Sequence, residues 1–236
     1  MSLLKDLLSF DRKMLSGKTA EARQLLLFDK PRAKYIIGVD EVGRGCLAGP
    51  VVAAAAMFDN LSGRGKEGLD RLNDSKTLSE ATRIELASAL KSHCRFFIAE
   101  ASVQEIDSIN ILQASLLAMK RAITGLLDDP TLASAEYGGA DFLVLVDGNK
   151  KIKNLGLEQV TVIKGDGRSA SIAAASVLAK VYRDQLMDKL AEQYPDYGWQ
   201  SNKGYPSALH REGIKHGGIS PWHRLSFRLL KDESED

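Results

Sequence analysis

The feature that most constrains the fold is a pair of apolar runs that each lead into an aspartate. One run covers residues 35–40 and ends in Asp40, and the other covers residues 142–146 and is followed by Asp147. A short continuous apolar run is typical of a strand that is buried on both faces of a sheet. Functional sites in open α/β sheets form at the carboxyl ends of such strands. If the two strands are neighbours, we expect the two carboxylates to lie together.

The other apolar patterns predict a mixed α/β fold. Further strands are expected over 51–58, 96–102 and 159–163, and Gly49-Pro50 predicts a hairpin turn before the first of them. Helices are expected over 3–14, 21–28, 79–91, 103–127, 169–193 and 207–215, and loops over 59–73, 128–140 and 195–206. This order predicts a five-stranded mixed sheet flanked by helices, with a C-terminal helical cap.

Composition limits the class of protein. The 236 residues carry a net charge of +1, so a surface that binds nucleic acid must be a local one. No apolar run reaches the roughly 18 residues of a membrane span, and the N-terminus lacks the pattern of a secretory signal. We therefore expect a cytoplasmic monomer. Cys46 and Cys94 are the only cysteines, and free thiols are expected rather than a disulfide.

A set of four acids carries the predicted chemistry: Asp40, Glu41, Asp147 and Asp184. In the predicted helix over 169–193, Asp184 shares a face with Ser176 and Lys180. Clustered carboxylates without histidine or cysteine select Mg²⁺ or Mn²⁺. Two such ions about 3.5–4 Å apart can cleave a phosphodiester with water.

Each acid also has an ordinary structural interpretation. A strand-ending aspartate is more often a turn residue or a cap, and Asp184 beside Arg183 would normally lie on a solvated helix face. Adjacent strand residues also point to opposite faces, so Asp40 and Glu41 cannot share one site from a regular strand. Gly43 and Gly45 are expected to relieve this conflict by ending the strand.

Several motifs, in order along the chain, resemble those of bacterial ribonuclease HII, a type 2 ribonuclease H. The first motif is GVDEVGRG at 38–45, followed by AGPVV at 48–52. This motif and the predicted helix SIAAASVLAKVYRD at 171–184 are the two most specific matches. The others are NDSK at 73–76, VDG at 146–148, KGD at 164–166, NKGY at 202–205 with His210, and HRLSF at 223–227. The matches run from about residue 35 to 227 and cover most of the chain.

The resemblance implies a ribonuclease H-like fold and cleavage of RNA in RNA–DNA hybrids. It also implies nicking on the 5′ side of single ribonucleotides embedded in duplex DNA, as in ribonucleotide excision repair, leaving 3′-hydroxyl and 5′-phosphate ends. We expect residues 1–34 to form a helical lead-in, 35–194 the catalytic domain, 195–230 a helical substrate-binding segment, and 231–236 a disordered tail. The four acids would hold a two-metal site of Mg²⁺ or Mn²⁺.

The resemblance also assigns substrate contacts. The turn at 43–45 would sense the ribonucleotide 2′-hydroxyl through its backbone, and Tyr205 would pack on the next deoxyribose, so that an RNA-to-DNA junction is read. The full set of expected substrate-binding residues is Gly43, Arg44, Gly45, Ser75, Lys76, Lys180, Arg183 and Tyr205. As isolated cations, the lysines and arginines would more often be ordinary surface charges.

Alternatives stay open. Ribonuclease HIII carries Gly-Lys-Gly where this chain has Gly-Arg-Gly, and it adds a substantial N-terminal domain, so HII is the better match. A DNA-only nuclease on the same fold, and a non-catalytic nucleic-acid or clamp-binding module, are the rival functions. Residues 24–28 (QLLLF) resemble the peptide that binds the bacterial sliding clamp. The same pattern is also typical of an apolar helix that packs on the core. His210, His216 and His223 have no assigned role.

Overall fold

The computed structural model describes residues 3–25, 33–62, 65–133 and 138–230, and it contains the predicted five-stranded mixed sheet. The strands are β1 (Tyr35–Val42), β2 (Val51–Met57), β3 (Arg95–Ala101), β4 (Phe142–Asp147) and β5 (Glu158–Val162), and their order across the sheet is β3-β2-β1-β4-β5. β1, β2 and β3 are antiparallel neighbours, whereas β4 runs parallel to both β1 and β5. The two aspartate-ending strands are therefore neighbours at the centre of the sheet.

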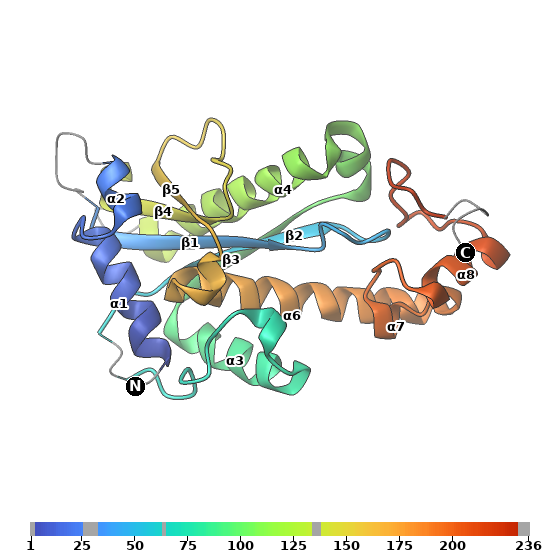
Figure 1. Ribbon diagram of the computed structural model, residues 1–236, viewed down its shortest axis with the longest axis horizontal. Helices are drawn as coiled ribbons and strands as arrows, with labels where there is room; N and C mark the ends of the chain where they lie inside the picture. Colours follow the sequence, from blue (N-terminus) through green and yellow to red (C-terminus); the bar gives the residue numbers. More distant parts are fainter. Residues whose placement is uncertain (1–2, 26–32, 63–64, 134–137, 231–236) are drawn as a thin grey trace.

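Helices cover both faces of this sheet (Figure 1). One face carries α6 (Ala170–Gln193), with α1 (Leu3–Leu15) and α3 (Glu80–His93) against it, and α4 (Val103–Leu127) covers the other. The alternation along β2 explains this arrangement, because Val52, Ala54 and Ala56 pack toward α6 while the residues between them pack toward α4. No helix in the described ranges is long and apolar enough to span a bilayer.

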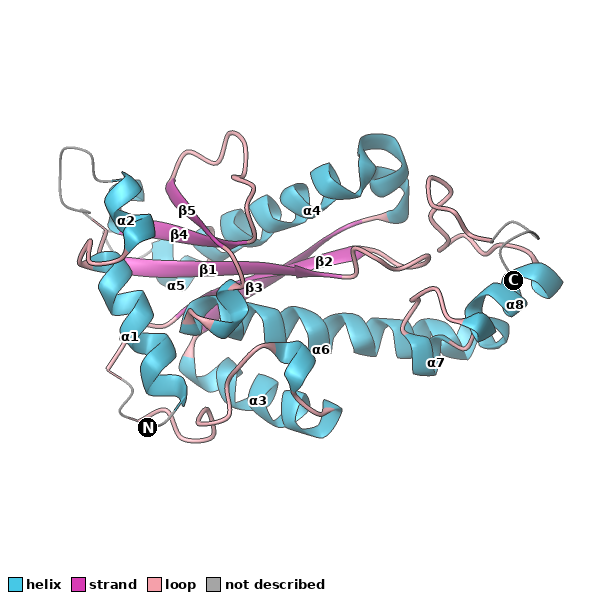
Figure 2. Cartoon of the chain, in the orientation of Figure 1, coloured by secondary structure: helices cyan, strands magenta, loops and turns pink. Residues whose placement is uncertain are grey.

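The chain ends as a helical segment beyond the sheet, at the right of Figure 2. It comprises the 3₁₀ turn η4 (Pro195–Tyr197), α7 (Trp199–Asn202) and α8 (Ala208–Gly217). An apolar cluster that includes Leu47, Met187, Trp199 and Ile214 joins this segment to α6 and to the turn after β1. The loop expected over 195–206 was thus wrong, since Pro195 begins one short helix and Gly198, in a left-handed conformation, begins the next.

The remaining elements are short. α2 (Ala20–Leu25) follows α1, the 3₁₀ turn η1 (Ser75–Thr77) precedes α3, and η3 (Gly165–Gly167) precedes α6. α5 (Pro130–Ala133) and η2 (Gly139–Asp141) lie within the stretch expected to be a loop over 128–140. Ser79 and Ser207 cap α3 and α8, because each side chain accepts a backbone N–H in the first turn. Most of the clamp-like peptide at 24–28 and the whole tail at 231–236 lie outside the described residues.

The N-terminal helix also touches the helix that lies along the site. Asp11 of α1 is fully buried, and its carboxylate accepts hydrogen bonds from the backbone N–H of Ser171 at 3.0 Å and from the Ser171 hydroxyl at 2.8 Å. Ser171 lies in the first turn of α6, where exposed N–H groups favour a negative partner. At the same end of α6, Gly38 of β1 allows close packing, since a Cβ there would lie 2.2 Å from the Ser171 backbone.

Candidate active site

Three predicted acids meet at the carboxyl ends of β1 and β4. Val39 pairs with Val146 across the parallel ladder, which brings Asp40 and Asp147 to the same point of the sheet. Asp40 is only 6% exposed, and its carboxylate also accepts the backbone N–H of Glu41 at 2.8 Å. The predicted meeting of these carboxylates at the strand ends is therefore seen in the structure.

The structure shows how Asp40 and Glu41, although adjacent on β1, can both lie near Asp147. β1 ends at Val42, directly before Gly43, as expected, but Asp40 and Glu41 both lie inside the strand, so its ending there does not relieve the conflict. Asp40 points to the α6 side, where the nearby Ser176 hydroxyl favours its charged form and lowers its pKa. Glu41 points to the α4 side and lines a cavity there together with Asp147. Because Asp147 ends its strand, it lies close enough to influence the acids on both faces.

The electrostatics of these acids indicate uncompensated negative charge. Burial, then the charges of Glu41 and Asp147, raise the pKa of Asp40 well above its ordinary value. Burial also raises the pKa of Glu41, although the Arg44 guanidinium, 3.1 Å from its carboxylate, acts against this. Within the described ranges, no three acids, histidines or cysteines converge closely enough to hold a metal ion as they stand. The donors nevertheless suit a hard divalent cation, since all are carboxylates and the Arg44 ion pair balances only Glu41 among these three acids.

Asp166, which had no predicted role, lies in the same acid cluster as Asp40 and Asp147. It lies in η3 and is 6% exposed, and burial and the charge of Asp147 raise the pKa of its carboxyl. The neighbouring Gly165 N–H donates to the Asp147 carboxylate at 2.7 Å, which ties η3 to the end of β4. The motif KGD at 164–166 was the available signal, but nothing in its spacing from Asp147 showed that the chain returns to the same point.

Asp184 lies apart from this group. Its carboxylate is 2.7 Å from Lys180 Nζ and 3.8 Å from an Arg83 guanidinium nitrogen. The acids that raise the pKa of Asp40 are Glu41, Asp147 and Asp166. Ser176 reaches Asp40, and Asp184 lies eight residues further along α6, which is about 12 Å along a helix axis. The shared helix face was predicted correctly, but it extends past the end of the strands.

Two expected substrate contacts lie on the turn before α3. Ser75 is buried, and its hydroxyl lies 2.8 Å from that of Ser176, so it connects η1 to α6 behind Asp40. The ammonium of Lys76 is 3.8 Å from the Asp166 carboxylate, and the Lys76 side chain is 81% exposed. Lys76 therefore presents a positive charge to solvent at the rim of the acid cluster, where a phosphate could meet it.

The Gly-Arg-Gly turn follows β1 directly and is held from within the protein. Gly43 has φ +96°, and a Cβ there would lie 2.3 Å from Arg183 Nε. Arg183 is fully buried and donates to the carbonyls of Ala48, Pro50 and Lys203 at 2.9–3.1 Å. This placement does not fit the phosphate contact expected for Arg183, because its guanidinium is enclosed and occupied by carbonyls.

A second buried arginine reaches the same turn from the C-terminal segment. Arg224 is 0% exposed and donates to the carbonyl of Gly49 at 2.8 and 2.9 Å and to that of Arg44 at 3.1 Å. The adjacent N–H groups of Leu225 and Ser226 donate to Asp107 of α4. Two arginines thus fix the backbone of the turn, which leaves the Arg44 side chain 51% exposed at the surface.

Tyr205 lies beside this turn, as a junction-reading residue would require. Tyr205 is 41% exposed, and a Cβ on Gly45 would lie 3.9 Å from one carbon of its ring. Burial of the hydroxyl and the nearby Cys46 thiol raise the pKa of Tyr205. The Leu47 N–H donates to the Gly204 carbonyl at 2.8 Å and joins the two loops. The structure therefore brings Gly43, Arg44, Gly45 and Tyr205 together on one surface.

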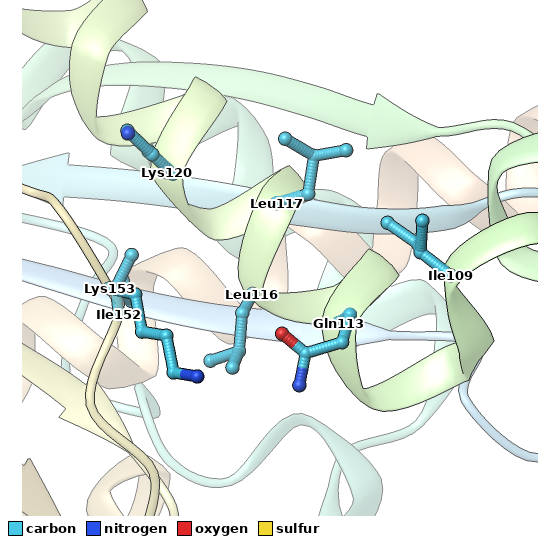
Figure 3. A pocket seen from close by; sticks show the side chains of 7 residues that line it. All are labelled: Ile109, Gln113, Leu116, Leu117, Lys120, Ile152 and Lys153. Carbon is cyan, nitrogen blue, oxygen red and sulfur yellow. The ribbon is translucent and has the colours of Figure 1, made fainter.

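Two hollows extend from the acids along α4. One of about 160 Å³ is lined by Glu41, Arg44 and Asp147, together with Lys150 and the α4 side chains. The next, of about 320 Å³, shares Leu116 with it and has Lys120 and Lys153 at its edge (Figure 3). In Figure 3, Lys153 extends from the loop after β4 toward Leu116 and Gln113. An apolar floor with lysines at the rim is compatible with a nucleic-acid backbone that runs past the acids.

Comparison with known proteins bears on the meaning of this geometry. The sequence model of the family Ribonuclease HII matches residues 37–230. Ribonuclease HII of Ruegeria pomeroyi is 52% identical over 195 residues, which cover 83% of this chain and 76% of that protein. Among solved structures, ribonuclease HII of Archaeoglobus fulgidus in a complex with PCNA aligns with a TM-score of 0.62 and 27% identity over 84% of this chain and 97% of that one. Bst-RNase HIII in complex with Mn²⁺ shares the fold, with a TM-score of 0.68 and 20% identity over 89% of this chain and 71% of that one.

Proposed function

The chain belongs to the ribonuclease HII family and is a ribonuclease H endonuclease acting on RNA–DNA hybrids, and from this premise we propose that it also nicks duplex DNA on the 5′ side of single embedded ribonucleotides. The observation that carries the proposal is the position of the Gly-Arg-Gly turn. It begins two residues after the buried acids and lies against Tyr205, so the sugar that is read and the bond that is cut are neighbours.

We further propose that Asp40, Glu41 and Asp147 hold Mg²⁺ or Mn²⁺, with Asp166 rather than Asp184 as the fourth acid. The shared electrostatics of Asp40, Asp147 and Asp166 support this set, and the ion pairs of Asp184 with Lys180 and Arg83 speak against its membership. When bound, two such ions would activate water and stabilise the leaving 3′-oxygen, which gives 3′-hydroxyl and 5′-phosphate ends.

The other residues of the site would bind and orient the substrate. Lys76 and Lys150 present ammonium groups at the two sides of the acid cluster, where they would pair with phosphates next to the scissile bond. Lys180 neutralises Asp184 at the α6 side, so it would contact phosphate only in part. The backbone of Gly43 and Gly45 would meet the 2′-hydroxyl, because glycine lets a sugar approach the main chain closely.

Tyr205 would distinguish a junction from a continuous RNA strand. A deoxyribose lacks the 2′-hydroxyl, so the flat face of a tyrosine ring can lie against it without burying an unpaired polar group. The partly exposed ring beside Gly45 supports this role. A single ribonucleotide followed by DNA would then fill both the Gly-Arg-Gly turn and the Tyr205 surface, and it would satisfy the requirements of excision repair.

We propose a sliding clamp as a further partner, bound through residues 24–28. The peptide pattern supports it, as does the complex that the Archaeoglobus fulgidus protein forms with PCNA. Mixing the protein with purified bacterial clamp should give a complex that Phe28→Ala abolishes. Absence of a complex with the unaltered protein would remove the idea. In the cell we expect a cytoplasmic monomer.

One comparison separates the proposal from its rivals. The protein is given a DNA duplex with one ribonucleotide, a matched all-DNA duplex and a uniform RNA–DNA hybrid, each with Mg²⁺. The proposal expects cleavage of the first and third only. A DNA-only nuclease would cut the all-DNA duplex, and a non-catalytic binding module would cut none of the three.

A further inference from the structure

The loop that carries Tyr205 is held at three of its consecutive carbonyls, and each of them contacts a nitrogen from a different part of the protein. The Lys203 carbonyl accepts from Arg183 of α6 at 2.9 Å, and the Gly204 carbonyl accepts from the Leu47 N–H at 2.8 Å. The Tyr205 carbonyl lies 2.9 Å from His210 Nδ1 of α8. It also accepts the Ser207 N–H at 2.8 Å, but that bond lies within the same turn and moves with it. His210 is thus the contact that fixes Tyr205 to the C-terminal segment.

The contacts of His210 and His223 determine where their protons lie. The Ser220 N–H donates to His223 Nδ1 at 2.8 Å, so the His223 proton must be on Nε2. The Trp199 indole N–H donates to His210 Nε2 at 2.9 Å, and His223 Nε2 lies 3.1 Å from the same nitrogen, so two donors approach its single lone pair. His210 Nε2 is therefore an acceptor, and the His210 proton lies on Nδ1, directed at the Tyr205 carbonyl.

These contacts lead from Ser220 through His223 and His210 to the Tyr205 carbonyl, and both histidine rings are enclosed. His210 is 0% exposed and His223 is 2% exposed, and Tyr197 and Trp199 pack against both rings. Because the Trp199 indole N–H must find an acceptor in this enclosed place, His210 is restricted to the tautomer that accepts at Nε2. Tyr205 is 41% exposed, so packing holds its side chain only in part.

We propose that His210 is a positioning residue for ribonucleotide recognition, whose Nδ1–H holds the Tyr205 backbone so that the tyrosine ring stays beside the Gly-Arg-Gly turn. The role rests on the proposed function of Tyr205 and deepens it. His223 and Trp199 act by fixing the tautomer of His210. The expected cost of losing the bond is a loss of preference for an RNA-to-DNA junction, rather than of cleavage as such, because His210 lies away from the acids.

A matched pair of variants tests the Nδ1–H contact. Asparagine carries its amide nitrogen close to the position of Nδ1, and glutamine carries its amide close to the position of Nε2. His210→Asn keeps a donor toward Tyr205, whereas His210→Gln keeps the contacts to Trp199 and His223 and loses that donor. The measurement is kcat/KM on a duplex with one ribonucleotide, divided by kcat/KM on a uniform RNA–DNA hybrid, with melting temperatures recorded for each variant.

We expect His210→Gln to lower this ratio about tenfold and His210→Asn to lower it by no more than about twofold, the size of one hydrogen bond to a positioned group. If the ratio falls equally in the two variants, or falls in proportion to the decrease in their melting temperatures, His210 is only structural and the inference is overturned. In a Tyr205→Ala background, His210→Gln should change the ratio no further, and a further drop would also overturn it.

The same set separates this inference from the function on which it rests. If Tyr205→Ala itself leaves the ratio unchanged, the proposed role of Tyr205 fails. If Tyr205→Ala lowers the ratio and His210→Gln does not, the role of His210 alone fails. The tautomers can also be measured on the unaltered protein, so that this test does not depend on whether a variant folds. The ¹⁵N NMR spectra of the histidine side chains should show the His210 proton on Nδ1 and the His223 proton on Nε2. A His210 proton on Nε2 would overturn the inference.

Discussion

The backbone of Gly43 lies directly on the guanidinium of Arg183, so close that a Cβ on Gly43 would come within 2.3 Å of Arg183 Nε. Gly43 belongs to the turn that is proposed to read the sugar, and Arg183 belongs to the helix that lies along the acids. The same guanidinium bonds Lys203, two residues before Tyr205. A single buried side chain therefore sets the spacing between the turn, the helix and the tyrosine loop.

Arg183→Lys should impair both stability and cleavage. A lysine ammonium cannot reach three carbonyls in the planar arrangement of a guanidinium, so buried carbonyls lose partners. We expect a loss of about 2–4 kcal/mol in the free energy of unfolding, since each unsatisfied buried group costs about 1–3 kcal/mol. Denaturant unfolding with cleavage assays measures this, and the exposed Arg23→Lys is the matched control. Equal behaviour of the two variants would show that Arg183 does not hold the turn.

Asp40→Asn should nearly abolish cleavage and stabilise the fold. Burial and three neighbouring acids disfavour the charged form of Asp40, so a neutral amide of the same shape removes a repulsion. The expected gain is about 1 kcal/mol in unfolding free energy, with a loss of roughly a thousandfold or more in kcat. Thermal unfolding without added metal and single-turnover cleavage measure the two effects. Cleavage at the rate of the unaltered protein would refute the assignment of Asp40.

Asp166→Asn and Asp184→Asn form a matched pair that identifies the fourth acid. We expect Asp166→Asn to lower kcat about a hundredfold or more while leaving the fold intact, as for an acid that acts in the reaction. Asp184→Asn should instead cost about 2 kcal/mol of stability, because Lys180 and Arg83 lose a buried partner. The reverse pattern, with kcat lost only in Asp184→Asn, would restore the assignment made from the sequence.

This pair also shows how far the sequence alone could lead. The two central strands, their parallel neighbours and the long helix were predictable from apolar periodicity, and so was the meeting of Asp40 with Asp147. The helix spacing correctly put Ser176, Lys180 and Asp184 on one face. It could not show where along that face the strands end, since that depends on how β1 and α6 are placed against each other at Gly38 and Ser171.

Contacts made by the backbone escaped prediction for a similar reason. Arg183 was expected to be a phosphate contact or a surface charge, and Arg224 had no expected role, because nothing in the sequence shows that carbonyls, rather than acids, surround a buried guanidinium. The same holds for His210 and His223, thirteen residues apart, whose rings meet only because α8 and the following turn fold back on Trp199. Features that depend on which loops meet in space need the structure.

Asp11 should make stability depend on pH. Burial raises the pKa of its carboxyl to about 6 in the folded protein, against 3.8 ordinarily. Between these values the folded state holds a proton that the unfolded state has lost. The contribution of Asp11 to the free energy of unfolding is therefore fully present below about pH 4 and is lost as the pH rises through 6. Asp11→Asn removes this titration. As the pH rises from 4 to 7, the free energy of unfolding of the variant should therefore increase relative to that of the unaltered protein by up to roughly 3 kcal/mol. Melting temperatures across this range measure it, and parallel curves for the two proteins would contradict it.

The most direct test of the central claim is to map the nick in a DNA duplex that contains one ribonucleotide. The protein is incubated with that duplex and Mg²⁺, beside an identical all-DNA duplex, and both strands are resolved at single-nucleotide length. The account predicts one nick, on the 5′ side of the ribonucleotide, with a 3′-hydroxyl and a 5′-phosphate, and no cut in the all-DNA control. A nick on the 3′ side, or equal cutting of the two duplexes, would contradict it.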